Sequence, residues 1–128
     1  MTDRFKQHGA FSWCELMTTD VEAAKEFYSR LFGWTTEPYP MGDMTYTVVK
    51  VGHESVGGIM KTPPQASGAP PHWGVYVTVD DVDATAKKAE EFGAKILVPP
   101  TEISTVGRFM VLQDPQGAVI YAITYSSS

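Results

Sequence analysis

Hydrophobic and polar positions change their spacing several times along the chain, and the order of these changes predicts the secondary structure. Residues 10–17 alternate in the way that is typical of a strand. Residues 21–32 place apolar side chains three and four positions apart, after a cap at Asp20 and before Gly33, and predict a helix. Residues 34–39 predict a short strand that ends at Pro40, and residues 47–60 predict a hairpin with its turn at 52–55.

The second half of the chain repeats this order. Residues 73–79 predict a strand, and residues 82–92 a helix that begins after Asp80 and Asp81 and ends at Gly93. Residues 95–98 predict a strand that ends at two prolines, and residues 109–113 and 118–123 a hairpin around the turn 114–117. The halves correspond at an offset of 61 or 62 residues, which aligns Trp13 with Gly74, Glu15 with Tyr76 and Ile59 with Tyr121.

This repeat predicts an α+β fold of two βαβββ modules within a single domain of 128 residues. Module 1 covers about residues 10–62 and module 2 about residues 72–125, and the Pro- and Gly-rich segment 61–71 joins them. Each module covers one sheet face with its helix and leaves the other face open. We expect the two open faces to form a half-barrel-like cleft that holds the functional site.

Strand alternation selects the side chains that line this cleft. In the last hairpin, pairing of Gln113 with Ala118 would set Met110 opposite Tyr121 and Arg108 opposite Ile123. Aromatic and flexible apolar walls with two opposite charges suit a small aromatic or amphiphilic ligand, although the same residues would serve as plain core. The predicted substrate-binding residues are Trp13, Glu15, His72, Tyr76, Arg108, Met110 and Tyr121.

Two of these residues are also candidates for catalysis. A buried carboxylate must be paired or protonated, so Glu15 is a candidate base, with Arg108 as its partner or as an anion anchor. His72 is the second candidate base, or a bland linker histidine. The pair Gly57-Gly58 indicates a β-bulge or the close approach of a ligand, and Cys14 is expected to be a buried apolar residue on the helix side.

Composition excludes several classes of function. The net charge of −5 and the absence of a basic run argue against nucleic-acid binding. No apolar run approaches the roughly 20 residues that cross a bilayer, so membrane insertion is not expected. One cysteine excludes an internal disulfide, and residues 1–9 are expected to fray and lack the apolar core of a secretory signal. These features together predict a cytoplasmic protein.

Three stretches together resemble the vicinal oxygen chelate superfamily, which includes glyoxalase I, bleomycin-resistance proteins and extradiol dioxygenases. They are residues 19–34, residues 79–84, and residues 114–117 before the last strand, within a resemblance that covers about residues 10–125. Metal-using members place His or Glu ligands at four positions, and none of the residues here is a good ligand for a divalent metal. The resemblance therefore implies no metal cofactor at the corresponding residues, which are Trp13, Ile59, Gly74 and Tyr121.

Three hypotheses about function follow. The first is a protein that binds a small aromatic or amphiphilic molecule without metal, as bleomycin-resistance members sequester their ligand. The alternative is a small-molecule enzyme of lyase, isomerase or dioxygenase type, either metal-independent with Glu15 or His72 as base or with displaced metal ligands. The third is a structural module whose cleft is filled by its own side chains. Single-domain members usually pair, and the exposed sheet edges give a physical reason to expect a homodimer, side by side or module-swapped.

Overall fold

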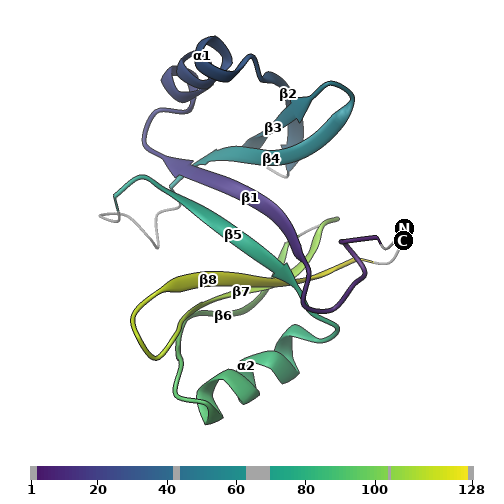
Figure 1. The fold of residues 1–128 in the computed structure, drawn as a ribbon, viewed down its shortest axis with the longest axis vertical. Helices are drawn as coiled ribbons and strands as arrows, with labels where there is room; N and C mark the ends of the chain where they lie inside the picture. Colours follow the sequence, from purple (N-terminus) through teal and green to yellow (C-terminus); the bar gives the residue numbers. More distant parts are fainter. Residues whose placement is uncertain (1–2, 42–43, 63–69, 104, 127–128) are drawn as a thin grey trace. The chain divides into compact units, whose positions relative to one another are not determined.

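A computed structural model describes residues 3–41, 44–62, 70–103 and 105–126 of the chain (Figure 1). The α+β class is confirmed, because each half follows the order strand, helix, three strands. The elements are β1 (Phe11–Thr18), α1 (Val21–Phe32), β2 (Thr35–Met41), β3 (Met44–Val51), β4 (Glu54–Lys61), β5 (His72–Thr78), α2 (Val82–Glu91), β6 (Lys95–Ile103), β7 (Gly107–Gln113) and β8 (Val119–Tyr125). The chain divides into two compact units, unit 1 with Met1–Ser12 and Val75–Ser128, and unit 2 with Trp13–Gly74.

Unit 2 packs α1 against a sheet in the order β2-β3-β4-β1, in which only the β1–β4 pair is parallel. Both ends of α1 follow the sequence prediction. The Asp20 carboxylate accepts the N–H of Ala23 at 3.0 Å, and Gly33 ends the helix with a left-handed φ of 74°. The buried centre of the unit consists of Leu16, Val49 and Ile59, with Val21, Ala24, Tyr28 and Trp34 packed against them.

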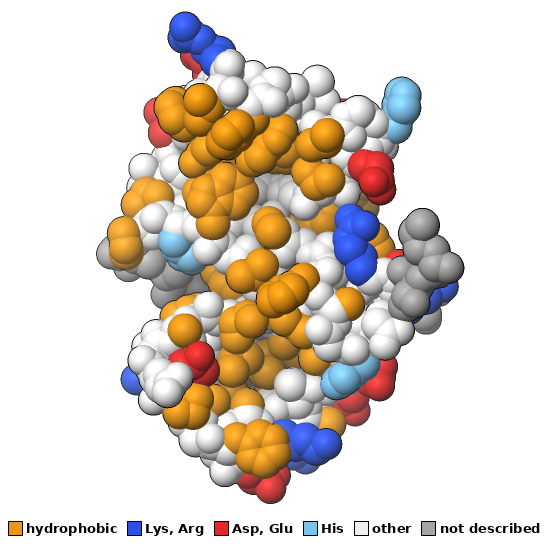
Figure 2. Space-filling view, viewed as in Figure 1, with side chains coloured by type: hydrophobic (Ala, Val, Ile, Leu, Met, Phe, Trp, Pro, Cys, Tyr) orange, Lys and Arg blue, Asp and Glu red, His pale blue; other side chains and the backbone are white. Residues whose placement is uncertain are grey.

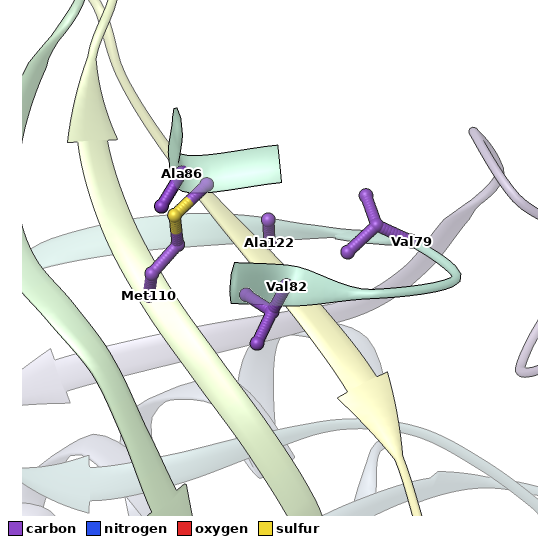
Figure 3. Packing of buried hydrophobic residues seen from close by; sticks show 5 residues of the cluster. All are labelled: Val79, Val82, Ala86, Met110 and Ala122. Atoms are coloured by element: carbon purple, nitrogen blue, oxygen red, sulfur yellow. The ribbon is translucent and has the colours of Figure 1, made fainter. Parts of the chain in front are cut away.

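Unit 1 packs α2 against a sheet in the order β5-β8-β7-β6, in which only the β5–β8 pair is parallel. The Asp81 carboxylate caps α2 by accepting the N–H groups of Asp83 and Ala84. Beneath the helix lies a cluster of five buried hydrophobic residues, Val79, Val82, Ala86, Met110 and Ala122 (Figure 3).

The register predicted for the last hairpin was wrong by one residue. Gln113 pairs with Val119, which sets Met110 opposite Ala122. The turn is longer than expected because Asp114 closes it: its carboxylate accepts the N–H of Ala118, and its own N–H donates to the Ala118 carbonyl. Since strand side chains alternate between faces, a shift of one residue exchanges the cross-strand partners of the whole hairpin.

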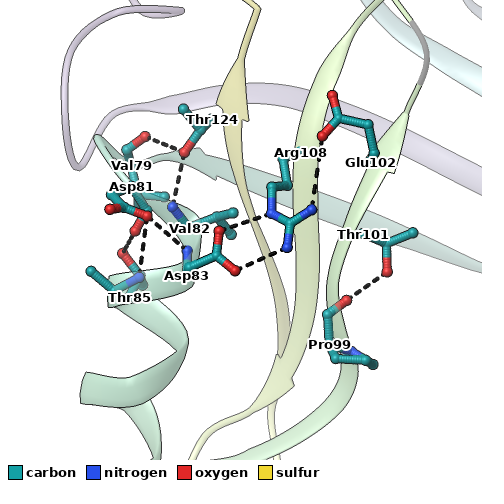
Figure 4. Close-up of polar contacts among 11 residues, drawn as sticks. Val79, Asp81, Val82, Asp83, Thr85, Pro99, Thr101, Glu102, Arg108 and Thr124 are labelled. Carbon is teal, nitrogen blue, oxygen red and sulfur yellow. Dashed lines mark hydrogen bonds and ion pairs between the residues drawn. The ribbon is translucent and has the colours of Figure 1, made fainter.

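Met110 and Arg108 consequently lie on the face of unit 1 that α2 covers, and their predicted place on the open face was wrong. Met110 is completely buried in the cluster beneath α2. The Arg108 guanidinium donates to both carboxylate oxygens of Asp83, at 2.8 and 3.0 Å, and lies 3.8 Å from Glu102 (Figure 4). Its carboxylate partners are thus these two residues, in place of the Glu15 that the sequence suggested.

The predicted alignment of Ile59 with Tyr121 was also wrong by one residue. Gly58 pairs with Glu15, whereas Ile59 pairs with Leu16 and is buried beneath α1. In unit 1, Tyr121 pairs with Tyr76, the residue that corresponds to Glu15, so Gly58 is the structural counterpart of Tyr121. The reason is a β-bulge, because the β3–β4 register shifts between Val49 and Lys50 and adds one residue to β4 just before Gly57-Gly58.

Two strands continue through prolines at which the sequence predicted an end. β2 continues past Pro40 to Met41, and β6 passes Pro99 and Pro100 and ends at Ile103. Both strands lie at an outer edge of their unit's sheet, where a residue without an N–H costs no ladder hydrogen bond. The predicted turn at 52–55 shortens to two residues, and positions 63–69 of the predicted linker lie outside the described residues.

Residues 3–9 do not fray as predicted but contact residues 75–126 of their own unit. The Gly9 N–H donates to the Thr78 carbonyl at 2.7 Å, the Thr78 hydroxyl donates to the Arg4 carbonyl at 2.7 Å, and the Phe5 ring packs edge-on against Tyr125. Cys14 is exposed rather than buried, because its partner in the β1–β4 ladder is a glycine with no side chain to cover it. Among the described helices, none is long and apolar enough to span a membrane.

Replacing Met110 by Ala should lower the free energy of unfolding by about 2–5 kcal/mol, because it leaves a cavity in the cluster beneath α2. Urea unfolding followed by circular dichroism measures the loss. Val119→Ala is the control, since Val119 lies on the neighbouring strand with 45% of its surface exposed and should cost under about 1 kcal/mol. Equal losses in the two variants would contradict the register described here.

Arg108 holds the pKa of the Asp83 carboxyl below its usual value of 3.8, first through their side-chain hydrogen bond, and Asp83 raises the pKa of Arg108. A lowered folded-state pKa means that the pair stabilises the fold above the unfolded-state value and loses this effect as pH falls through the folded-state value. We expect carboxyl NMR titration to give Asp83 a pKa below 3.8, and Arg108→Gln to raise that pKa. An unchanged Asp83 titration in Arg108→Gln would show that the pair has no effect in solution.

Candidate functional site

The open face of unit 2, opposite α1, joins Trp13 and Glu15 through a third residue, Tyr46. The indole N–H of Trp13 donates to the Tyr46 hydroxyl at 2.8 Å, and that hydroxyl donates to Glu15 Oε2 at 2.7 Å. The direction is fixed by chemistry, since an indole N–H only donates and a carboxylate oxygen accepts. The structure therefore groups two of the predicted site residues around a tyrosine that the sequence had not singled out.

A glycine makes room for this tyrosine. Glu15, Gly58 and Val48 are consecutive partners across β1, β4 and β3, and Tyr46 lies two residues from Val48 on the same face. A Cβ atom on Gly58 would overlap the Tyr46 hydroxyl, so the ring crosses β4 over a position that has no side chain. The β-bulge predicted at Gly57-Gly58 is confirmed, and the group that closely approaches Gly58 is the chain's own Tyr46 rather than a ligand.

The Tyr46 hydroxyl also explains how the Glu15 carboxylate can lie buried on this face of unit 2. Glu15 and Tyr46 are 6% and 7% exposed, and a carboxylate at such a depth needs hydrogen-bond donors. The Tyr46 hydroxyl is such a donor, at the 2.7 Å separation that is usual for an O–H···O hydrogen bond. The sequence contained a signal for this contact, because a glycine opposite Glu15 leaves space for a long side chain from the neighbouring strand.

His72, the other candidate base, lies at the start of β5 and is half-buried. Its Nδ1 is 2.9 Å from the Pro70 carbonyl oxygen. A carbonyl accepts only, so Nδ1 carries the proton in this contact, and in the neutral ring Nε2 is the basic nitrogen.

The face of unit 1 opposite α2 holds the predicted pair Tyr76 and Tyr121, and each of these side chains is 4% exposed. These residues are direct partners in the β5–β8 ladder, and their ring centroids lie 4.8 Å apart at an interplanar angle of 50°. On the same unit, the Ser12 hydroxyl is hydrogen-bonded to the Tyr125 hydroxyl at 2.8 Å. Unit 1 thus contributes an aromatic pair to its own face.

The residues at the superfamily's ligand positions do not fit a divalent metal. In the corrected register these positions hold Trp13, Gly58, Gly74 and Tyr121, none of which offers an imidazole or a carboxylate. Within residues 3–41, 44–62, 70–103 and 105–126, no group of three or more His, Cys, Asp or Glu side chains gathers to hold an ion. No chemical step is therefore assigned to a metal in this chain.

Known proteins similar to this chain include some that are more than twice as long as the matched region and one of about the same length. "Putative glyoxylase CFP32" of Mycobacterium bovis is 39% identical over 117 residues, and "Anthracycline biosynthesis protein DnrV" of Streptomyces peucetius is 32% identical over 123 residues. The matches cover 89% and 86% of this chain but only 45% of each relative, so the chain spans less than half their length. A "Glyoxylase-like domain-containing protein" of Didymella fabae is 30% identical, with 86% of this chain and 89% of that protein covered.

Solved structures show the same fold at low sequence identity. Methylmalonyl-CoA epimerase of Mycobacterium tuberculosis superposes with a TM-score of 0.63 at 15% identity, over 90% of this chain and 86% of that one. A variant of the Streptomyces coelicolor epimerase, in complex with 2-nitronate-propionyl-CoA, gives a TM-score of 0.65 at 17% identity, over 94% and 100%. At such identities the likeness concerns the fold alone.

A family model matches residues 10–121, nearly the stretch over which the sequence motifs suggested a resemblance. Together with relatives at 30–39% identity, this match confirms the predicted fold family. The chain belongs to the Glyoxalase/Bleomycin resistance protein/Dioxygenase superfamily.

Proposed function

We propose that this chain binds a small aromatic or amphiphilic molecule on the open face of unit 2, without a bound metal, and that Glu15 receives the polar group of the ligand. The observation that supports this proposal is the chain of hydrogen bonds from Trp13 through Tyr46 to Glu15. It sets one oriented carboxylate beside aromatic surface, which is the composition of sites that fix a small molecule by few polar contacts.

The direction of these bonds selects the ligand class. The Trp13 N–H is directed to Tyr46, and the Tyr46 O–H is directed to Glu15, so each proton of the chain points toward the carboxylate. A ligand group that meets Glu15 therefore has to be a donor, such as a hydroxyl or an amine. The half-buried indole of Trp13 offers a flat surface for the body of the molecule.

The relatives are consistent with this class. One is named as an anthracycline biosynthesis protein, and anthracyclines are polycyclic aromatic compounds that carry hydroxyl groups. The name belongs to a protein more than twice as long as the matched region, so it supports the chemistry of the ligand rather than its identity.

A second candidate function is metal-independent catalysis, with Glu15 as the general base. A carboxylate positioned by a tyrosine is suited to take a proton from a bound substrate and return it, as an isomerase or a lyase requires. His72 Nε2 is the other candidate base. If the wild type converts a bound compound, and Glu15→Gln abolishes this turnover but still binds the compound, catalysis is favoured over sequestration.

Two probes of nearly the same shape test the proposal. We expect 2-naphthol, which carries a donor, to bind more tightly than 2-methoxynaphthalene, which has none, in titrations followed by NMR. Glu15→Gln should remove most of this preference, a loss of about 1–3 kcal/mol, because the charged acceptor is gone. Trp13→Ala should weaken both probes by about 1–3 kcal/mol.

Trp73→Ala is the matched control, since Trp73 belongs to the same unit but packs against Tyr28 and Trp34 near α1 and should leave both probes unaffected. Urea unfolding of Trp13→Ala separates binding from folding. If Trp13→Ala lowers the free energy of unfolding by about 3–5 kcal/mol, and neither probe raises the melting temperature of the wild type, Trp13 is a core residue and the proposal is wrong.

Gly58→Ala tests whether the glycine holds the tyrosine in place. The added methyl group should displace the Tyr46 ring, lower stability by about 1–3 kcal/mol and reduce the preference for 2-naphthol. In a Tyr46→Ala background the same change should cost much less, because the clash is gone. Equal costs in both backgrounds, measured by urea unfolding, would show that the contact between Gly58 and Tyr46 is not the cause.

A further inference from the structure

Helix α1 carries large apolar side chains that are more than half exposed among the residues that the structure describes. Phe27, Leu31 and Phe32 are 57%, 57% and 58% exposed, and no residue of α1 is fully buried. In α2, by contrast, Val82 and Ala86 are buried beneath the helix. Contiguous exposed apolar surface of this kind marks an interaction site more often than it marks a solvent face.

The uncovered residues form an ordered surface on the helix. Ala23, Phe27 and Leu31 follow one another at intervals of four, which places them in one row, and Glu26 and Arg30 form the adjacent edge. These five residues line one shallow hollow. We call them the α1 outer face, because the sheet core of unit 2 contacts the other side of the helix through Val21, Ala24 and Tyr28. Figure 2 shows hydrophobic side chains gathered below the position of α1.

We propose that the α1 outer face binds the same face of a second copy of this chain, with the two helices antiparallel about a two-fold axis. In such a pair each edge of one helix meets the same edge of the other, with its direction reversed. Glu26 of one copy then lies beside Arg30 of the other, and this contact occurs twice. The small Ala23 meets the large Leu31, and the Phe27 rings meet near the axis.

Charge favours a second copy over other occupants. The edge carries one acidic and one basic residue, which lie 3.8 Å apart within each copy and are both well exposed. A nucleic acid or an anionic membrane binds a positively charged surface, whereas this face has no net charge. Its acidic residue can pair with the basic residue of a second, antiparallel copy. The proposal assigns the dimer expected from the sequence to a helix surface instead of the sheet edges, and it does not depend on the proposed function.

Sedimentation equilibrium of the full chain tests the proposal. The wild type should dimerise at micromolar concentration, with a mass about twice 14.1 kDa. Phe27→Asp should raise the dissociation constant about a hundredfold or more, since it sets two charges against each other in the apolar centre. Glu26→Arg and Arg30→Glu should each raise it about five- to tenfold, because like charges then face each other.

The dissociation constant of the double variant Glu26→Arg/Arg30→Glu is the decisive measurement. This variant restores opposite charges across the two-fold axis and should return the dissociation constant to within about threefold of the wild type. Lys25→Glu is the matched control, because it changes the charge of the same helix equally but lies outside the hollow. Circular dichroism melting checks that every variant is folded.

Three results would overturn the proposal. The first is a wild type that stays monomeric at 100 micromolar. The second is a dimer that Phe27→Asp leaves intact, which would place the interface elsewhere, for example at a sheet edge. The third is a double variant as weak as the single reversals, which would exclude the antiparallel two-fold arrangement.

Discussion

The pairing register of the strands decides which side chains of this protein lie beneath a helix and which remain on an open face. Because strand side chains alternate, one residue of shift moves a whole strand's pattern to the opposite face. The β1–β4 register puts Glu15 beside Gly58 and sends Ile59 under α1. The β7–β8 register does the same for Met110 beneath α2. Core and candidate site are therefore two consequences of one set of pairings.

The candidate site depends on a glycine as much as on a carboxylate. Gly58 allows the Tyr46 ring to cross β4, and Tyr46 in turn supplies the donor that Glu15 needs at its depth. Tyr46 is one donor to this carboxylate, whereas Arg108 is bound to Asp83 in the other unit. The Tyr46 hydroxyl thereby orients Glu15, which suits either an anchor for a ligand donor or a base.

The duplicated modules have diverged in what their helices do. Both helices begin at an aspartate cap, and the chain after each turns at a glycine with positive φ. α2 buries two residues in its own unit, whereas α1 keeps large apolar side chains on its outer side.

The sequence by itself determined the order of elements, the helix caps and the family, because caps, glycine stops and apolar spacing are local signals that neighbouring residues specify. It also identified Trp13, Glu15, Tyr76 and Tyr121 as residues of the two open faces. Tertiary structure alone decided the faces of Ile59, Arg108 and Met110, since a bulge before Gly57 and the turn closed by Asp114 each moved a register by one residue. It alone also revealed Tyr46, because a glycine in the sequence indicates space but does not say which side chain from a neighbouring strand crosses it.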